Sequence, residues 1–146
     1  MNKSIKILFV AVALLQGHNL LAQSSDIEKK KFNSFKEIED QIGYTQAVRV
    51  GNTIYISGLA ARGPMSEAVK KIYDQLGKIL VAHHATYQNI VKETAYTTQI
   101  EELIKQQDLR KQYYKNDYPA STWVEIKRLY VPDAVLEIDF IAQVKE

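Results

Sequence analysis

Two acidic side chains in an apolar run near the end of the chain are the first candidates for chemistry. Glu137 and Asp139 lie within the run 134–142, which is written AVLEIDFIA. In an extended strand they would share one face, separated by roughly 6.5–7 Å along the strand. Because burying a carboxylate is costly unless it is paired or hydrogen-bonded, two acids in so apolar a strand suggest a functional pair, such as a general acid and a general base.

Metal chemistry has little support from the residues. The chain has no cysteine, and His83 and His84 are adjacent, so they cannot share one face of a helix. Neither histidine has an acidic or histidine neighbour four residues further on, which is the spacing that helical metal ligands use. We therefore expect no metal site, and we expect both histidines to lie on the surface near a helix end, where they complement the helix dipole.

The first residues have the pattern of an export signal. Lys3 and Lys6 form a short positive start, and the apolar run over 7–15 that follows is too short to span a bilayer. We expect cleavage after the small residue Ala22. The sequence therefore predicts a signal peptide over 1–22, so that the protein is exported, periplasmic or secreted, and has no stable membrane anchor.

Charge and length predict one nearly neutral domain. The chain has 19 Lys and Arg against 17 Asp and Glu, and loss of Lys3 and Lys6 with the leader would leave 17 against 17. So balanced a charge does not favour a nucleic-acid surface. Roughly 120 residues would remain, which suits one domain. We expect a lead-in segment over 23–41 and the domain over 42–146.

Strand and helix patterns alternate along the mature chain. Two strand-like runs joined by Gly51-Asn52 indicate a first hairpin. An amphipathic stretch predicts a helix with Ser66 as its N-cap, and a capping-box pattern that begins at Thr98 predicts a second helix. The expected elements are strands over 42–50 and 53–57, a helix over 66–84, a strand over 87–97, a helix from Thr98 to the region 116–119, and a final hairpin of strands 121–129 and 134–142. This order, ββαβαββ, indicates one compact α+β domain.

The alternation within the final strand distinguishes its two faces. One set of side chains is wholly apolar and should face the two helices, whereas the set with both acids should face away from them. The first set is Leu136, Ile138, Phe140 and Ala142, and the second is Val135, Glu137, Asp139 and Ile141. Trp123, on the partner strand of the hairpin, is expected to join the charged face. Because a mixed apolar and charged sheet face is often covered by other copies of the chain, we infer a homo-oligomer with any site between subunits.

Three segments together resemble one protein family. They are GYTQAVRVGNTIYISG at 43–58, VKETAYT at 91–97 and YPASTWVEIKRLYVPDAVLEIDFIA at 118–142. In this order and spacing they are similar to the Rid (YjgF-like) family of reactive-intermediate enamine/imine deaminases. The resemblance implies a chorismate-mutase-like α+β fold with two helices packed on one face of the sheet. It also implies a homotrimer with ligand clefts between neighbouring subunits.

The resemblance also implies a chemistry and a set of residues. Members of the family hydrolyse a reactive 2-imino or enamine acid to the keto acid and ammonia, without a metal or an organic cofactor. By position, Tyr44 matches the tyrosine near the first strand, Ser57 and Gly58 match a Ser-Gly turn, and Glu137 matches the glutamate that helps place a water.

One departure concerns the residue that holds the substrate. The family pattern has Pro-Ala-Arg-Ser, in which the arginine binds the substrate carboxylate, but this chain has Ser121 at the arginine position. A hydroxyl lacks the charge-assisted bond, which is commonly worth about 1.5–3 kcal/mol. Leu59 replaces a glutamine, and Trp123 stands where a small residue is usual. The usual 2-imino acid is therefore not expected as the substrate.

Several alternatives remain open from the sequence alone. Arg62, in the loop expected after Gly58, is the nearest candidate for a replacement cation. Glu137 could be a structural carboxylate bonded to backbone, Tyr44 could pack in an interface, and Trp123 could belong to an oligomer core. We therefore carry two hypotheses: a Rid-like hydrolase acting on a reactive imine or enamine, and a non-catalytic trimer that binds a small apolar or aromatic molecule between subunits.

Overall fold

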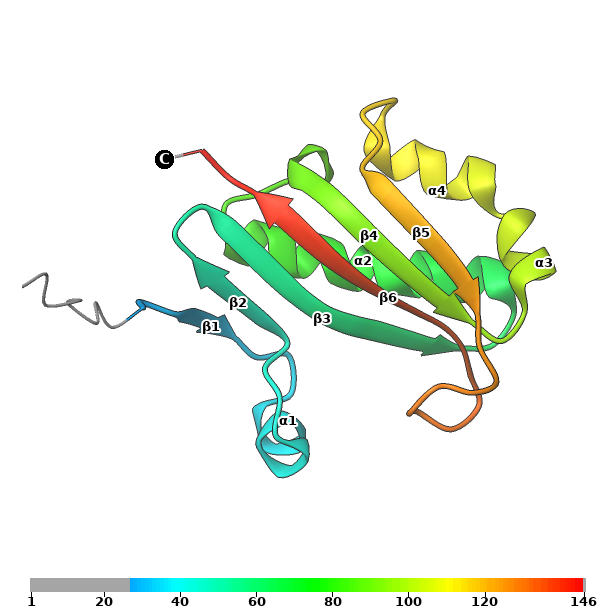
Figure 1. Cartoon of the computed structure of the whole chain (residues 1–146), viewed down its shortest axis with the longest axis horizontal. Coiled ribbons are helices and arrows are strands. Elements are labelled where there is room, and N and C mark those ends of the chain that lie inside the picture. The colour runs from blue at the N-terminus through cyan, green and yellow to red at the C-terminus, as the bar shows by residue number, and fades with distance from the viewer. Residues whose placement is uncertain (1–26, 146) are drawn as a thin grey trace, which may run out of the picture.

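The computed structural model describes residues 27–145, so the predicted signal peptide over 1–22 lies outside the described residues. The strands are β1 (Lys30–Phe32), β2 (Ala47–Val50), β3 (Thr53–Arg62), β4 (Ile90–Thr97), β5 (Ala120–Glu125) and β6 (Ala134–Gln143). The helices are α1 (Lys36–Ile42), α2 (Met65–Ala82), α3 (Ile100–Ile104) and α4 (Gln107–Tyr114), with a 3₁₀ turn, η1, over Tyr87–Asn89. Within the described residues, the six strands form one sheet, and α2, α3 and α4 lie on one face of it while α1 lies apart from them (Figure 1). None of the helices between residues 27 and 145 is both long and apolar enough to cross a membrane.

The sheet has the order β1-β2-β3-β6-β4-β5, and the prediction of a final hairpin is wrong. β6 lies between β3 and β4 and is antiparallel to both, whereas β5 pairs in parallel with β4 at the edge. The physical reason is the segment between β4 and β5. Because α3 and α4 carry the chain back along the sheet, the strand that follows them runs parallel to β4.

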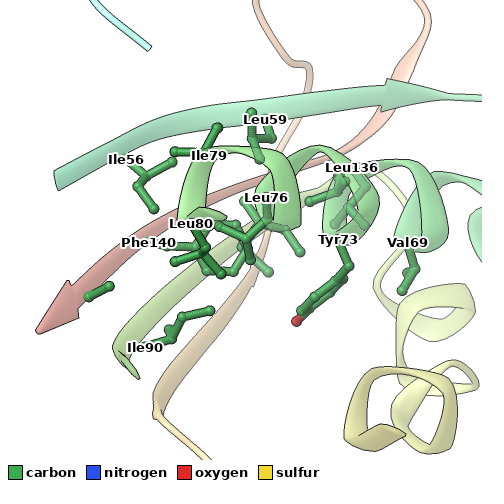
Figure 2. Close-up of a cluster of buried hydrophobic side chains, with 14 of the residues drawn as sticks. Ile56, Leu59, Val69, Tyr73, Leu76, Ile79, Leu80, Ile90, Leu136 and Phe140 are labelled. Atoms are coloured by element: carbon green, nitrogen blue, oxygen red, sulfur yellow. The ribbon is translucent and has the colours of Figure 1, made fainter. Parts of the chain in front are cut away.

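The face that β6 turns toward the helices is correctly predicted. Leu136 and Phe140 are fully buried, and they pack with Tyr73 and Leu76 of α2 in the core (Figure 2). The opposite face of β6, which carries Glu137 and Asp139, is only half-buried. The α+β class and the ββαβαββ order are confirmed, with β1 and α1 added in front and the second helix divided into α3 and α4.

Both predicted N-caps are wrong. α2 begins at Met65, directly after Pro64, so Ser66 lies inside the helix. Proline has no backbone N–H, but this donor has no intrahelical partner at the start of a helix, so proline does not disrupt the helix there. The N-cap of α3 is Gln99, and the Thr98 side chain makes no cap. Instead the hydroxyl of Thr97 accepts a hydrogen bond from the Gln99 amide at 3.0 Å.

The region ahead of the first predicted strand is part of the fold. β1 pairs antiparallel with β2, and a buried carboxylate, Glu39 of α1, organises the connection between them. Glu39 accepts hydrogen bonds from the backbone amides of Ser34, Phe35 and Gln46 at 2.6–3.0 Å. Without Glu39 these backbone amides would lack hydrogen-bond partners. The Glu39 side chain therefore holds in place both the residues just before α1 and Gln46, which follows it.

The two adjacent histidines have different surroundings. His84 is exposed, but the expectation of a surface position is wrong for His83, which is only 7% exposed. Its ring meets the Phe32 ring edge-on at 6.1 Å between centroids, so strand β1 covers it. Burial lowers the pKa of His83, and the neighbouring charge of Arg49 lowers it further.

Candidate functional site

Glu137 lies over a bulge in strand β3. The register of β3 against β6 shifts between Ile56 and Leu59, so Ser57 and Gly58 form an irregular step beside Glu137. A Cβ atom built on Gly58 would overlap the Glu137 side chain, lying only 2.8 Å from its Cγ atom. The absence of a side chain at Gly58 therefore creates the space that the Glu137 carboxyl group occupies.

Tyr44 and Ser57 complete this group on the sheet face that points away from the helices. The Ser57 hydroxyl donates a hydrogen bond to the Thr45 carbonyl at 2.8 Å, which holds the segment before β2 against β3. Partial burial raises the pKa of the Tyr44 phenol, and the negative charges of Glu39 and Glu137 raise it further. The structure thus brings together four of the predicted site residues: Tyr44, Ser57, Gly58 and Glu137.

The electrostatics of Glu137 suit proton transfer. Burial raises the pKa of its carboxyl group, and the charge of Asp139 adds to that rise. A carboxyl group with a raised pKa is a better proton acceptor, and it can also return a proton near neutral pH. Asp139 lies opposite Thr94 of β4, and its charge and hydrogen bond raise the pKa of Tyr96, after the larger effect of burial.

Ser121 and Trp123 belong to a second group, on the helix side of the sheet. The prediction that Trp123 shares the charged face is wrong, because the parallel register pairs it with Ala95, whose side chain is buried under the helices. The Ser121 hydroxyl donates to Oε1 of Glu93 at 2.6 Å, and the indole Nε1 of Trp123 donates to the same oxygen at 3.2 Å. Glu93 is fully buried.

Arg110 and two tyrosines complete the surroundings of Glu93. Nε and Nη2 of Arg110 each lie 2.6 Å from Oε1 of Glu93, while the hydroxyls of Tyr114 and Tyr73 donate to Oε2 at 2.6 and 2.9 Å. Burial by itself would raise the pKa of Glu93. The hydrogen bonds from Ser121 and Tyr114 and the charge of Arg110 outweigh burial, and they hold the pKa of Glu93 below its usual value.

A small cavity opens beside this network. Its volume is about 290 Å³, and the residues around it are Gln107, Arg110, Lys111, Ser121 and Trp123. The Arg110 guanidinium packs against the rings of Tyr114 and Trp123, with its central carbon 4.9 and 5.6 Å from the two ring centroids. We call this space the Arg110 cavity.

The structure places Arg62 elsewhere and adds residues that sequence reasoning missed. Nε of Arg62 donates to the Pro132 carbonyl at 2.7 Å, so this side chain holds the loop before β6. Glu93 and Arg110 are not predicted from the sequence, because both lie far along the chain from Gly58 and neither belongs to the motifs around Ser121 and Glu137. A usable signal was Glu93 itself, an acid in a strand of otherwise mainly apolar and threonine residues. Between residues 27 and 145, no three metal-binding side chains come together.

Comparisons with known proteins agree on one family. Residues 21–144 match the family model described as endoribonuclease L-PSP. A human protein named 2-iminobutanoate/2-iminopropanoate deaminase is 33% identical over 95 residues, which cover 59% of this chain and 69% of the relative. A RutC family protein of Pyrococcus abyssi is 28% identical over 108 residues, covering 68% of this chain and 84% of the relative.

Solved structures show the same fold. A member of the YjgF/YER057c/UK114 family from Mycobacterium tuberculosis superposes with a TM-score of 0.74 at 24% identity, covering 80% of this chain and 100% of that one. A protein described as a putative endoribonuclease from Thermotoga maritima gives a TM-score of 0.65 at 26% identity, with 70% and 87% of the two chains covered.

Proposed function

The chain belongs to the endoribonuclease L-PSP family, and from this premise we propose that it is a hydrolase that releases ammonia from a reactive imine or enamine. The names of several relatives support the reaction class, since they are called 2-iminobutanoate/2-iminopropanoate deaminases. The observation that carries the proposal is the position of Glu137. Its carboxyl group, with a raised pKa, lies over Gly58 and beside Tyr44.

The proposed reaction needs only a water and one proton carrier. Glu137 accepts a proton from the water while the water oxygen bonds to the carbon of the C=N group. The same carboxyl group then gives this proton to nitrogen, which completes a carbinolamine. Glu137 next takes the proton of the new hydroxyl group and passes it to the same nitrogen, so the C–N bond breaks and a carbonyl compound and neutral ammonia leave. An enamine follows this course after it has taken the imine form. The raised pKa of Glu137 favours these proton transfers, because the acid and base forms are then closer in energy near neutral pH.

We propose that the complete site requires neighbouring subunits of a homotrimer. Within one chain the Glu137 group lies on the outward face of the sheet, while Ser121 and Trp123 lie on the helix side at the β5 edge. One small ligand cannot reach both groups through a packed sheet. The outward face also carries half-buried or exposed apolar side chains of the kind that an interface covers, among them Tyr55, Val124 and Ile141.

We propose that the substrate differs from the small 2-imino acids in the names of the relatives. Ser121 has a hydroxyl instead of a charged group, and that hydroxyl is bonded to Glu93. Trp123 fills part of the adjoining space. We therefore do not expect a charged side chain of strand β5 to hold the substrate.

Ammonia release tests the proposal directly. Imines would be generated in place by an oxidase from a panel of amines and amino acids, and ammonia formation would be compared with and without the protein. We expect acceleration for at least one imine and at least 100-fold loss in Glu137→Gln. The matched variant Asp139→Asn should lose far less activity, because the charge of Asp139 only adds to the rise in the pKa of Glu137 that burial causes. No acceleration across the panel would rule out the deaminase. Thermal stabilisation by a small aromatic ligand that Trp123→Ala weakens would then favour the binding-only alternative.

We also propose that the protein is exported, on the sequence pattern over 1–22. Mass spectrometry of the protein expressed at full length in a bacterial host tests this. The expected product lacks the first 22 residues and is found outside the cytoplasm. A full-length product in the cytoplasmic fraction would contradict export.

A further inference from the structure

Arg110 has more hydrogen-bonding capacity than its partner Glu93 uses. A guanidinium carries five N–H donors in a planar fork. Nε and Nη2 are bonded to Oε1 of Glu93, which occupies one edge of the group. Among residues 27–145, no acceptor takes a hydrogen bond from Nη1. The second edge, formed by Nη1 and Nη2, matches the two oxygens of a carboxylate.

The Arg110 cavity has the lining that an anion needs. Two of its five lining side chains, Arg110 and Lys111, are cations, and none of the five is acidic. Lys111 also pairs with the exposed Asp108 on its own helix at 3.0 Å, so Arg110 is the main anion-binding group. The cavity also lies at the first turn of α4, where Gln107 begins the helix and the helix dipole adds positive potential. Trp123 supplies a flat apolar wall beside these charges, which suits a planar group attached to the anion.

The network around Glu93 holds Arg110 ready for a ligand. The Arg110 side chain is only 13% exposed, and it is fixed by two contacts to Glu93 and by the rings of Tyr114 and Trp123. A fixed donor loses little conformational entropy when a ligand binds. Ser121, Tyr73 and Tyr114 also donate hydrogen bonds to Glu93, so Arg110 is not the only group that stabilises the negative charge of Glu93.

We propose that the Arg110 cavity binds the carboxylate of the substrate, with the second edge of the Arg110 guanidinium as the anchor. The substrate is then the imine or enamine of an organic acid whose body packs against Trp123, and its anchor comes from helix α4 in place of strand β5. The reacting C=N group in this statement rests on the proposed function, whereas the carboxylate-binding step does not.

The only tryptophan of the chain lines the cavity, so its fluorescence reports binding there. Trp123 emission would be titrated with benzoate and with benzamide, a neutral probe of the same shape. We expect benzoate to bind at least tenfold more tightly than benzamide, and Arg110→Gln to remove that difference. The matched control Arg62→Gln should bind both probes as the wild type does, because Arg62 is bonded to Pro132. Equal affinity of the wild type for the two probes would overturn the inference.

A second measurement needs no substitution, in case Arg110→Gln does not fold. Benzoate should shift the Arg110 Nε–Hε resonance in NMR spectra of the wild-type protein, and an unchanged resonance at saturating benzoate would overturn the inference. Glu137→Gln should lose ammonia release but keep benzoate binding. If the protein hydrolyses an imine but binds benzoate no more tightly than benzamide, the role of Arg110 in carboxylate binding is refuted and the proposed function stands. If it prefers benzoate but hydrolyses no imine, the role of Arg110 is supported and the proposed function is refuted.

Discussion

Glu93 shows how a single buried acid can be stable in this fold. Five side chains from three elements donate hydrogen bonds to its two oxygens, and one of them, Arg110, also brings a positive charge. These contacts tie helices α2 and α4 to the edge strand β5. A carboxylate with so many donors is ionised in the folded state, in agreement with its lowered pKa.

Removal of the Glu93 charge should destabilise the protein strongly. In Glu93→Gln the buried guanidinium of Arg110 loses its counter-ion, and breaking a buried pair in this way typically costs about 3–5 kcal/mol. Urea unfolding at pH 7 measures the loss. Glu137→Gln is the matched control: it also removes an acid from the sheet, but burial raises the pKa of Glu137, so its stability should be unchanged or higher. Equal losses in the two variants would contradict this account.

The pH dependence of stability should follow the same residue. Because the folded-state pKa of Glu93 is lower than the unfolded value of about 4.3, its stabilisation is fully present above that value. It is lost as the pH falls from about 4.3 toward the lower folded-state pKa. Urea unfolding from pH 6 to pH 3 should therefore show a steeper decline in the wild type than in Glu93→Gln. Parallel curves would show that Glu93 does not titrate differently on folding.

Gly58 provides a residue-scale test of the candidate site. In Gly58→Ala the new methyl group needs the space of the Glu137 carboxyl, which must turn away while the backbone stays in place. We expect at least tenfold loss of ammonia release with a change in unfolding free energy below about 1 kcal/mol, because the displaced group is the end of a flexible side chain. Full activity in Gly58→Ala would mean that the position of Glu137 is not critical.

At the scale of the elements, alternation along β6 was sufficient to predict which of its residues form the core. The same reasoning failed for β5, because adjacent strands in sequence were assumed to pair. The expected face of Trp123 is therefore wrong, and within one chain the structure pairs Ser121 with Glu93. The partnership of Arg110 with Glu93 joins α4 to β4 across 17 positions, and no local pattern in the sequence indicates it.

A second element-scale feature is the contact between α2 and the turn before β4. The Tyr87 hydroxyl donates to the Tyr73 carbonyl at 2.7 Å, and it would lie 2.6 Å from a Cβ atom at Gly77. Alanine normally stabilises a helix interior by about 1 kcal/mol over glycine. Here the methyl group displaces the tyrosine from its carbonyl.

Gly77→Ala should therefore have opposite effects in two backgrounds. In the wild type we expect a loss of about 1 kcal/mol, since the Tyr87 hydrogen bond is broken. In Tyr87→Phe the nearest ring carbon would be 3.4 Å away, so the same change should stabilise by up to about 1 kcal/mol. A double-mutant cycle by thermal or urea unfolding measures the difference. The same sign in both backgrounds would refute the role of the hydroxyl.

At the scale of the whole molecule, no helix between residues 27 and 145 covers the outward face of the sheet. One side of the sheet is covered by helices, while the other carries Tyr55, Val124, Ile141 and the acid Glu137, none of which is fully buried. The sequence predicted this two-sided character from β6 alone. It could not show which strands flank β6, so the composition of the outward face emerged only from the structure.

A charged side chain on the outward face should dissociate the proposed trimer into monomers. Ile141→Glu adds a carboxylate to the outward face between its register partners, Tyr55 on β3 and Lys92 on β4. Lys92 already donates to Thr122, so a subunit interface would have to bury the added charge at a high cost. Analytical ultracentrifugation should show a trimer for the wild type and monomers for Ile141→Glu. Val81→Glu is the control, because Val81 is 73% exposed on the helix side of the molecule. A monomeric wild type would refute the trimer.

The central position of β6 has a consequence for how the chain is made. Among the strands that residues 27–145 form, β6 is the last along the chain, yet β3 and β4 each depend on it for the hydrogen bonds of one edge. While the nascent chain is still attached to the ribosome without β6, those two strands have unpaired edges and the core lacks Leu136 and Phe140. A premature stop anywhere before Ala134 would leave β3 and β4 each with one unpaired edge that could pair with another chain. The sheet can therefore reach its native pairing only after β6 has been made.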